Sequence, residues 1–212
     1  IVQTVRSSRE EPSKIDLNPG ESLSIHDALI ALMVKSANDI SVAVAEKISG
    51  SVEAFVEEMN AEAAQLGMTD TTYASPNGLP PPKKNRGKKM VSTRGFDIST
   101  PHDLAKLAIA TIKEYPEILK FSSIVYGTVP GKGGKPLTLK NHNNLLWKKG
   151  FVNRDVDGLK TGYIKAGGSS VVVTAKRKNK RVVVVVTGSV SAKTRDTHAG
   201  QIVKNALDAI DW

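Results

Sequence analysis

Two groups of polar residues, far apart in the chain, are of types that could do chemistry in one cleft. Ser36 and Asn38 stand two positions apart on a short connection between two helical patterns, so a hydroxyl and an amide can point the same way. Lys160, Thr161 and Gly162 end a predicted strand. A lysine there can hold a carboxylate or lower the pKa of a nearby hydroxyl. The threonine adds a hydroxyl donor, and the glycine lets a substrate backbone lie against the strand edge.

Each group by itself also has an ordinary structural explanation. A Ser-x-Asn pair between helices commonly caps the second helix, and a Lys-Thr-Gly tripeptide commonly ends an exposed strand. The chain has no cysteine, which excludes disulfides and thiolate ligands. Its histidines lack metal-ligand spacing; they are His26, His102, His142 and His198. We therefore predict neither a metal site nor a cofactor.

The elements that must position these groups begin with helices. Ser24 and Ser51 are predicted N-caps, and Gly50 and Gly67 are predicted to end helices. Thr100-Pro101 has the cap and first-turn proline of a further helix. The connection that carries Ser36 and Asn38 thus lies between the first helix and the second.

The C-terminal third of the chain is rich in β-branched residues. The predicted strands are residues 124–129, 157–161, 169–176 and 181–188, and a helix is predicted over residues 194–210. The run 182–186 consists of valines and is apolar on both faces, which requires cover on both faces. Helices, then strands, then a helix indicate an α/β (α+β) fold with one sheet between helical layers.

Composition restricts the class of partner. The formal net charge of +9 favours an anionic partner, or reflects only a solvated surface rich in lysine. Aromatic residues make up 5% of the chain, too few for a stacking surface, so we predict no nucleic-acid partner.

Residues 80–96 combine three prolines with a basic run and are predicted to form an exposed loop. No apolar run is long enough to span a bilayer.

Taken together, several short segments resemble the serine-type D-alanyl-D-alanine carboxypeptidases, the low-molecular-mass penicillin-binding proteins. The segments are Lys35-Ser36-Ala37-Asn38-Asp39, Leu66-Gly67-Met68, Ser75-Pro76-Asn77-Gly78-Leu79, Asn141-His142-Asn143-Asn144-Leu145-Leu146 and Val156-Asp157-Gly158-Leu159-Lys160-Thr161-Gly162. The resemblance extends from about Asp16 to Ile210. It implies the fold shared by penicillin-binding proteins and β-lactamases, with an antiparallel sheet between helical layers. It also implies an extracytoplasmic enzyme that acts on peptidoglycan stem peptides and binds β-lactam antibiotics.

The resemblance also implies roles for single residues. Ser36 would relay protons toward the leaving D-alanine, and Asn38 would hydrogen-bond the substrate amide. Lys160 and Thr161 would hold and polarise the substrate. The backbone N–H of Tyr163 would form half of an oxyanion hole.

Arg195 would engage the terminal carboxylate of the substrate, although an arginine at the start of a helix is also commonly solvated. The nucleophile of this family is the serine of a Ser-x-x-Lys motif, and none of the 212 residues begins such a motif. We therefore expect residues 1–212 to be a partial catalytic domain that begins after its nucleophile and lacks the N-terminal strands of the sheet. Any association with a membrane would use a segment outside these residues.

Two alternatives remain open at this point. One is a β-lactamase of the same superfamily, which the sequence disfavours because no glutamate stands in a recognisable deacylating motif between Asn38 and Lys160. The other is a non-catalytic cell-wall-binding relative that kept the cleft without the serine. The strand over residues 181–188 is expected to pair with the missing N-terminal segment or with a second copy of the chain.

Overall fold

The computed structural model describes residues 1–79 and 95–209, so the predicted basic loop 80–96 lies outside the described residues except at its last two positions. The first part of the chain forms helices. They are η1 (Ser7–Arg9), α1 (Ile25–Ile30), η2 (Ala31–Lys35), α2 (Asn38–Ser49) and α3 (Val52–Gln65). After the undescribed segment come α4 (Pro101–Glu114) and α5 (Ile118–Ser122). The sequence pattern did not indicate α5.

Local capping explains where three of these helices begin. The Ser24 hydroxyl accepts a hydrogen bond from the Asp27 N–H at 3.0 Å, and α1 follows. Ser51 and Thr100 do the same for α3 and α4, the latter with a proline at its first position. These hydrogen bonds confirm the predicted N-caps. The sequence could predict them because each N–H donor lies only three residues beyond its cap.

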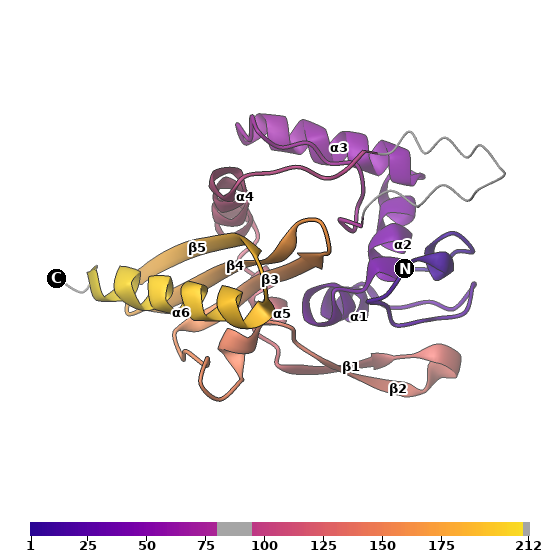
Figure 1. Ribbon diagram of the computed structural model, residues 1–212. Helices are drawn as coiled ribbons and strands as arrows, with labels where there is room; N and C mark the ends of the chain where they lie inside the picture. The colour runs from indigo at the N-terminus through magenta and orange to yellow at the C-terminus, as the bar shows by residue number, and fades with distance from the viewer. Residues whose placement is uncertain (80–94, 210–212) are drawn as a thin grey trace.

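The strands form two separate sheets. They are β1 (Tyr126–Pro130), β2 (Pro136–Lys140), β3 (Val156–Ile164), β4 (Gly168–Arg177) and β5 (Lys180–Ser189). All pairs are antiparallel, with β1 against β2 and with the order β3-β4-β5 in the larger sheet. The prediction of a single sheet was wrong for residues 124–129, because that strand pairs with β2, which the sequence pattern did not indicate. Figure 1 shows the β1–β2 ribbon beside α1, apart from the larger sheet.

Helices cover both faces of the larger sheet, as predicted for this class of fold. Helix α6 (Ala192–Ala209) packs along one face, while α4 and α5 contact the strands from the other (Figure 1). The core under α6 is closed: Val173, Val203 and Leu207 are completely buried. Valines at the neighbouring strand positions point to the opposite face of the sheet. Two of them, Val172 and Val183, are only half-buried. Cover on the α4 side is therefore incomplete.

Strand β5 lies at an edge of the sheet. Within residues 1–79 and 95–209 it pairs with β4 and with no other strand. Its run of valines has the composition of an interior strand, so an open backbone edge lies along an apolar strand. Among the described residues, no helix is both long and apolar enough to cross a membrane.

Candidate active site

The structure brings together Ser36 and Lys160, which are 124 residues apart in the chain. The Lys160 ammonium donates one hydrogen bond to the Ser36 hydroxyl at 2.8 Å and one to the Thr161 carbonyl at 2.7 Å. Burial, and then the charge of Arg195, lower the pKa of Lys160 to about 8. A lysine with this pKa can hold an anion at neutral pH and still exchange its proton readily with a neighbouring hydroxyl.

The backbone around Ser36 explains how its hydroxyl reaches Lys160. The π-helical turn η2 continues α1 and ends at Ser36, which adopts a left-handed conformation with φ 58° and ψ 48°. Such turns and left-handed non-glycine residues are uncommon and occur preferentially at functional sites. Ser36 does not cap α2, because the N-cap is Ala37 and no side chain caps that helix. The interpretation of Ser36 and Asn38 as a capping pair is therefore wrong.

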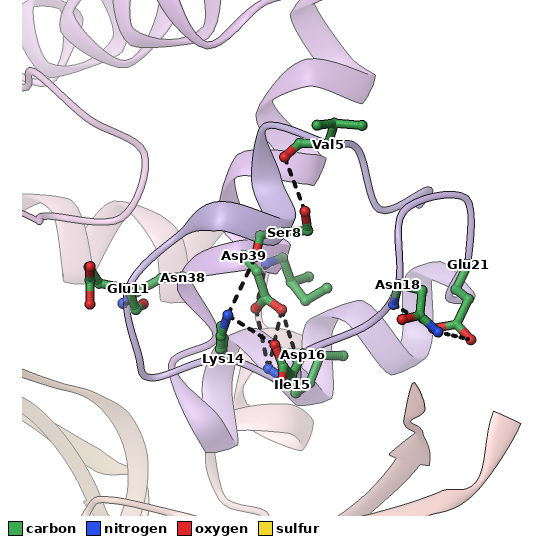
Figure 2. Close-up of polar contacts among 11 residues, drawn as sticks. Val5, Ser8, Glu11, Lys14, Ile15, Asp16, Asn18, Glu21, Asn38 and Asp39 are labelled. Carbon is green, nitrogen blue, oxygen red and sulfur yellow. Dashed lines mark hydrogen bonds and ion pairs between the residues drawn. The ribbon is translucent and has the colours of Figure 1, made fainter. Parts of the chain in front are cut away.

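Asn38 is held from the other side by the N-terminal loop. Its side-chain amide donates to the Glu11 carbonyl at 2.9 Å, and its backbone N–H donates to the Ser13 carbonyl at 2.7 Å. Figure 2 shows the Asn38 amide beside Glu11. The side chain is 8% exposed. Asn38 thus ties the loop to the start of α2, and its role toward a substrate stays a prediction.

The next residue, Asp39, anchors the same loop. Its fully buried carboxylate accepts hydrogen bonds from the backbone N–H groups of Ile15, Asp16 and Ile40 at 2.9–3.3 Å. Figure 2 shows the carboxylate between α2 and this loop. Burial raises the pKa of Asp39, and the three N–H donors oppose that effect. The loop that contacts Asn38 is therefore fixed by a buried polar cluster, which sequence patterns did not reveal.

The outer edge of β3 offers room for an extended peptide. A methyl group added at Gly162 would meet no atom within 4 Å, so the strand is open at this position. Thr161 is half-buried, while the Tyr163 side chain is 70% exposed. Among the described residues β3 has β4 as its strand partner on one edge, which leaves the opposite edge for a ligand.

Arg195 lies in the interior and not in solvent. It is 4% exposed, and its guanidinium contacts one oxygen of the Asp196 carboxylate at 2.7 and 2.8 Å. The other oxygen of Asp196 accepts from the Asn144 side chain at 2.6 Å. The alternative of a solvated arginine at the start of a helix is therefore wrong. The charge of this buried guanidinium contributes to the lowered pKa of Lys160.

Asn144 belongs to a segment to which the sequence assigned no chemical role. Asn141 and Asn143 are buried, whereas His142 between them is exposed. Partial burial and the charges of Lys160, Lys35 and Arg195 lower the pKa of His142. The resemblance includes this segment as a motif, and the cations that act on His142 come from parts of the chain far from it in sequence.

A cavity of about 410 Å³ lies beside Lys160, Thr161 and Gly162, on the side of the sheet where cover is incomplete. Its lining is mainly apolar; it includes Met33, Leu104, Leu107, Leu159 and Val172. The cavity reaches from η2 and α4 to the larger sheet, and Lys160 is the catalytic candidate that lines it.

A family model described as D-alanyl-D-alanine carboxypeptidase matches residues 2–191. The chain belongs to this family. The D-alanyl-D-alanine carboxypeptidase DacF of Bacillus subtilis is 33% identical over 92% of this chain and 46% of its own length. The chain therefore spans about half the length of such curated relatives.

Solved structures of the family share the fold. Penicillin-binding protein 6B from Escherichia coli has a TM-score of 0.78 and 32% identity, covering 96% of this chain and 60% of that one. Penicillin-binding protein D2 from Listeria monocytogenes, in its ampicillin-bound form, has a TM-score of 0.68 and 29% identity. It covers 95% of this chain and 72% of that one. These likenesses confirm the predicted class of fold.

Proposed function

We propose that this chain is the larger part of the catalytic domain of a serine D-alanyl-D-alanine carboxypeptidase. The substrate is a peptidoglycan stem peptide that ends in D-Ala-D-Ala, so the site of action is extracytoplasmic. The contact between Lys160 and Ser36, beside the open edge of β3, is the observation that carries the proposal. Membership of the family supports it.

The geometry suggests how these residues take part. A substrate lies extended along β3 past Gly162, with its terminal carboxylate toward Lys160 and Arg195. A serine oxygen attacks the carbonyl carbon of the penultimate D-alanine while its proton passes to the lysine of the same Ser-x-x-Lys motif, and the N–H of Tyr163 stabilises the resulting oxyanion. The C–N bond then breaks, and Ser36 passes a proton to the departing amine while Lys160 supplies its hydrogen-bond partner. Water hydrolyses the acyl-serine ester, which releases the shortened peptide and restores the serine.

The attacking serine is proposed to lie in a segment outside these 212 residues. No Ser-x-x-Lys occurs in the sequence. We propose that this segment packs in the mainly apolar cavity beside Lys160, from where it presents its serine to Lys160 and Ser36. The edge of β5 that has no strand partner within residues 1–79 and 95–209 offers the same segment, or a second copy of the chain, a strand to pair with.

β-Lactam antibiotics are proposed to acylate the same serine. The Listeria relative in its ampicillin-bound form supports this extension. A β-lactam carries a carboxylate next to its reactive amide, so Lys160 and Arg195 would receive it as they receive the peptide terminus.

The test uses the full-length protein and a peptide that ends in D-Ala-D-Ala. We expect release of one D-alanine per peptide and covalent labelling by a fluorescent penicillin, both blocked by prior treatment with unlabelled penicillin. Neither release nor labelling in correctly folded protein would overturn the proposal. Binding of the peptide without either reaction would instead support the non-catalytic cell-wall binder.

A further inference from the structure

We propose that Ser13 is a positioning residue of this site. It holds the turn that carries Ser36 and Asn38, and so places the Ser36 hydroxyl for the proton transfer to the departing amine. Ser13 belongs to the N-terminal loop, and the sequence pattern assigned it no role. The inference rests on the proposed function, because that function makes Ser36 the residue that delivers this proton.

The turn at Ser36 leaves backbone groups that the helices on either side cannot satisfy themselves. The π-helical turn η2 ends at Lys35 and α2 begins at Asn38, with Ser36 in its left-handed conformation between them. The last carbonyls of one helix and the first N–H groups of the next have no partners within those helices. A left-handed non-glycine residue also persists only where surrounding contacts fix it. The turn therefore needs support from another part of the chain.

Ser13 supplies this support on both sides of Ser36. Its hydroxyl donates to the Lys35 carbonyl at 2.8 Å, and its own carbonyl accepts the backbone N–H of Asn38 at 2.7 Å. Ser13 lies 22 residues before Lys35 in the chain, so the contact is tertiary and not part of a local turn. One residue thus satisfies a carbonyl at the end of η2 and an N–H at the start of α2.

The loop that carries Ser13 is itself fixed at two further points. The Glu11 carbonyl accepts a hydrogen bond from the Asn38 side-chain amide at 2.9 Å. The buried Asp39 carboxylate accepts the backbone N–H of Asp16 at 3.0 Å. Figure 2 shows Glu11 beside Asn38 on one side of the loop and Asp16 beside Asp39 on the other. Ser13 lies between these two anchors, so its position relative to the turn is set in advance.

The consequence for the reaction concerns the leaving group. The Ser36 hydroxyl lies 2.8 Å from the Lys160 ammonium, and in the proposed reaction it must also reach the departing nitrogen. Without the Ser13 hydroxyl the Lys35 carbonyl loses its donor, and the turn that aims Ser36 is free to shift. A misplacement of about 1 Å can slow a positioned step about 100-fold. A reaction whose leaving group needs no proton should not be affected.

The experiment uses the full-length enzyme and two substrates that differ only in the leaving group. One is a peptide ending in D-Ala-D-Ala, whose departing nitrogen must take up a proton. The other is the thioester in which D-thiolactate replaces the terminal D-alanine, and its sulfur departs as a thiolate. The quantity measured is kcat/KM, which covers the steps through acylation. Ser13→Ala should lower kcat/KM about tenfold for the peptide and leave it unchanged for the thioester.

Two variants serve as controls. Ser8→Ala is the matched one, because the Ser8 hydroxyl donates to the Val5 carbonyl at 3.0 Å in the same N-terminal segment (Figure 2). It loses a hydrogen bond of the same kind and should leave both substrates unaffected. Ser13→Thr keeps the hydroxyl and should restore most of the peptide rate. Equal slowing of both substrates by Ser13→Ala would overturn the inference, since it would indicate a merely structural role, and so would no slowing at all.

A double variant tests whether Ser13 acts through Ser36. Ser36→Ala alone should slow the peptide selectively, by about 100-fold or more, because it removes the proton donor. Adding Ser13→Ala should then cause no further loss, since residues that act as one unit are not additive. A further loss as large as that of Ser13→Ala alone would refute the role of Ser13. Failure of the proposed function would appear separately, as a wild-type enzyme that cleaves neither substrate.

Discussion

Replacing Lys160 with methionine should remove most of the activity while the protein stays folded. The ammonium donates a hydrogen bond to Ser36, and in the proposed reaction it also contacts the substrate carboxylate. One hydrogen bond that involves a charged group contributes about 1.5–3 kcal/mol. Losing one such bond in the transition state slows acylation about 10- to 200-fold, and losing both slows it at least about 100-fold.

The same change should cost little stability. The pKa of Lys160 falls from 10.5 to about 8, mainly because of burial. At about 1.4 kcal/mol per pKa unit, keeping this ammonium charged at neutral pH costs the folded state about 3 kcal/mol. Methionine removes this cost of the buried charge. It also removes the two hydrogen bonds to Ser36 and to the Thr161 carbonyl, whose combined stabilisation is of similar magnitude. We therefore expect a melting temperature within a few degrees of the wild type.

The sign of the pH dependence follows from the lowered pKa. Between about pH 8 and pH 10.5 the unfolded chain keeps the Lys160 proton that the folded chain has released, so wild-type stability should rise with pH in this window. Acylation by a fluorescent penicillin should decrease as the pH rises through about 8. Lys160→Met should show neither change.

The assay is the rate of penicillin labelling in the full-length enzyme, with thermal unfolding measured on the same samples. Lys165→Ala is the matched control, because that lysine is exposed in the turn after β3. Labelling at the wild-type rate in folded Lys160→Met would refute the role given to the ammonium. Loss of labelling together with a collapse of the melting temperature would show that the residue is structural.

Four further predictions concern packing and charge. Gly158→Ala would place a methyl group 2.5 Å from the Ser122 hydroxyl and should lower the free energy of unfolding by about 1–3 kcal/mol. Gly162→Ala, with open space around it, should unfold like the wild type but turn over peptide more slowly, and equal melting temperatures for the two variants would contradict this reasoning. Deleting residues 83–89, which carry five lysines or arginines, should weaken sedimentation with purified cell wall at low salt and not at high salt. Equal sedimentation at low salt would mean that the charge is only a solvated surface. Residues 1–212 expressed alone should self-associate or unfold without a sharp transition, because one edge of β5 has no strand partner among the described residues. A soluble monomer with a cooperative transition would show that the edge is covered in another way.

The sequence by itself determined those features that depend on near neighbours. Ser24, Ser51 and Thr100 cap their helices because each hydroxyl receives an N–H only three residues along. The valine run 182–186 of β5 indicated a strand that needs cover on both faces. The motifs around Ser36 and Lys160 indicated the family before any geometry was known.

Tertiary structure decided what the site residues contact. The left-handed conformation of Ser36 follows a π-helical turn that no local pattern marks, and its partner Lys160 is 124 residues away. The burial of Arg195 depends on its pairing with Asp196, and the surroundings of His142 depend on three elements from distant parts of the chain. A pattern along the chain can specify hydrogen bonds between near neighbours. The distance between two charges, and the pKa values that result from it, exist only once the elements have packed.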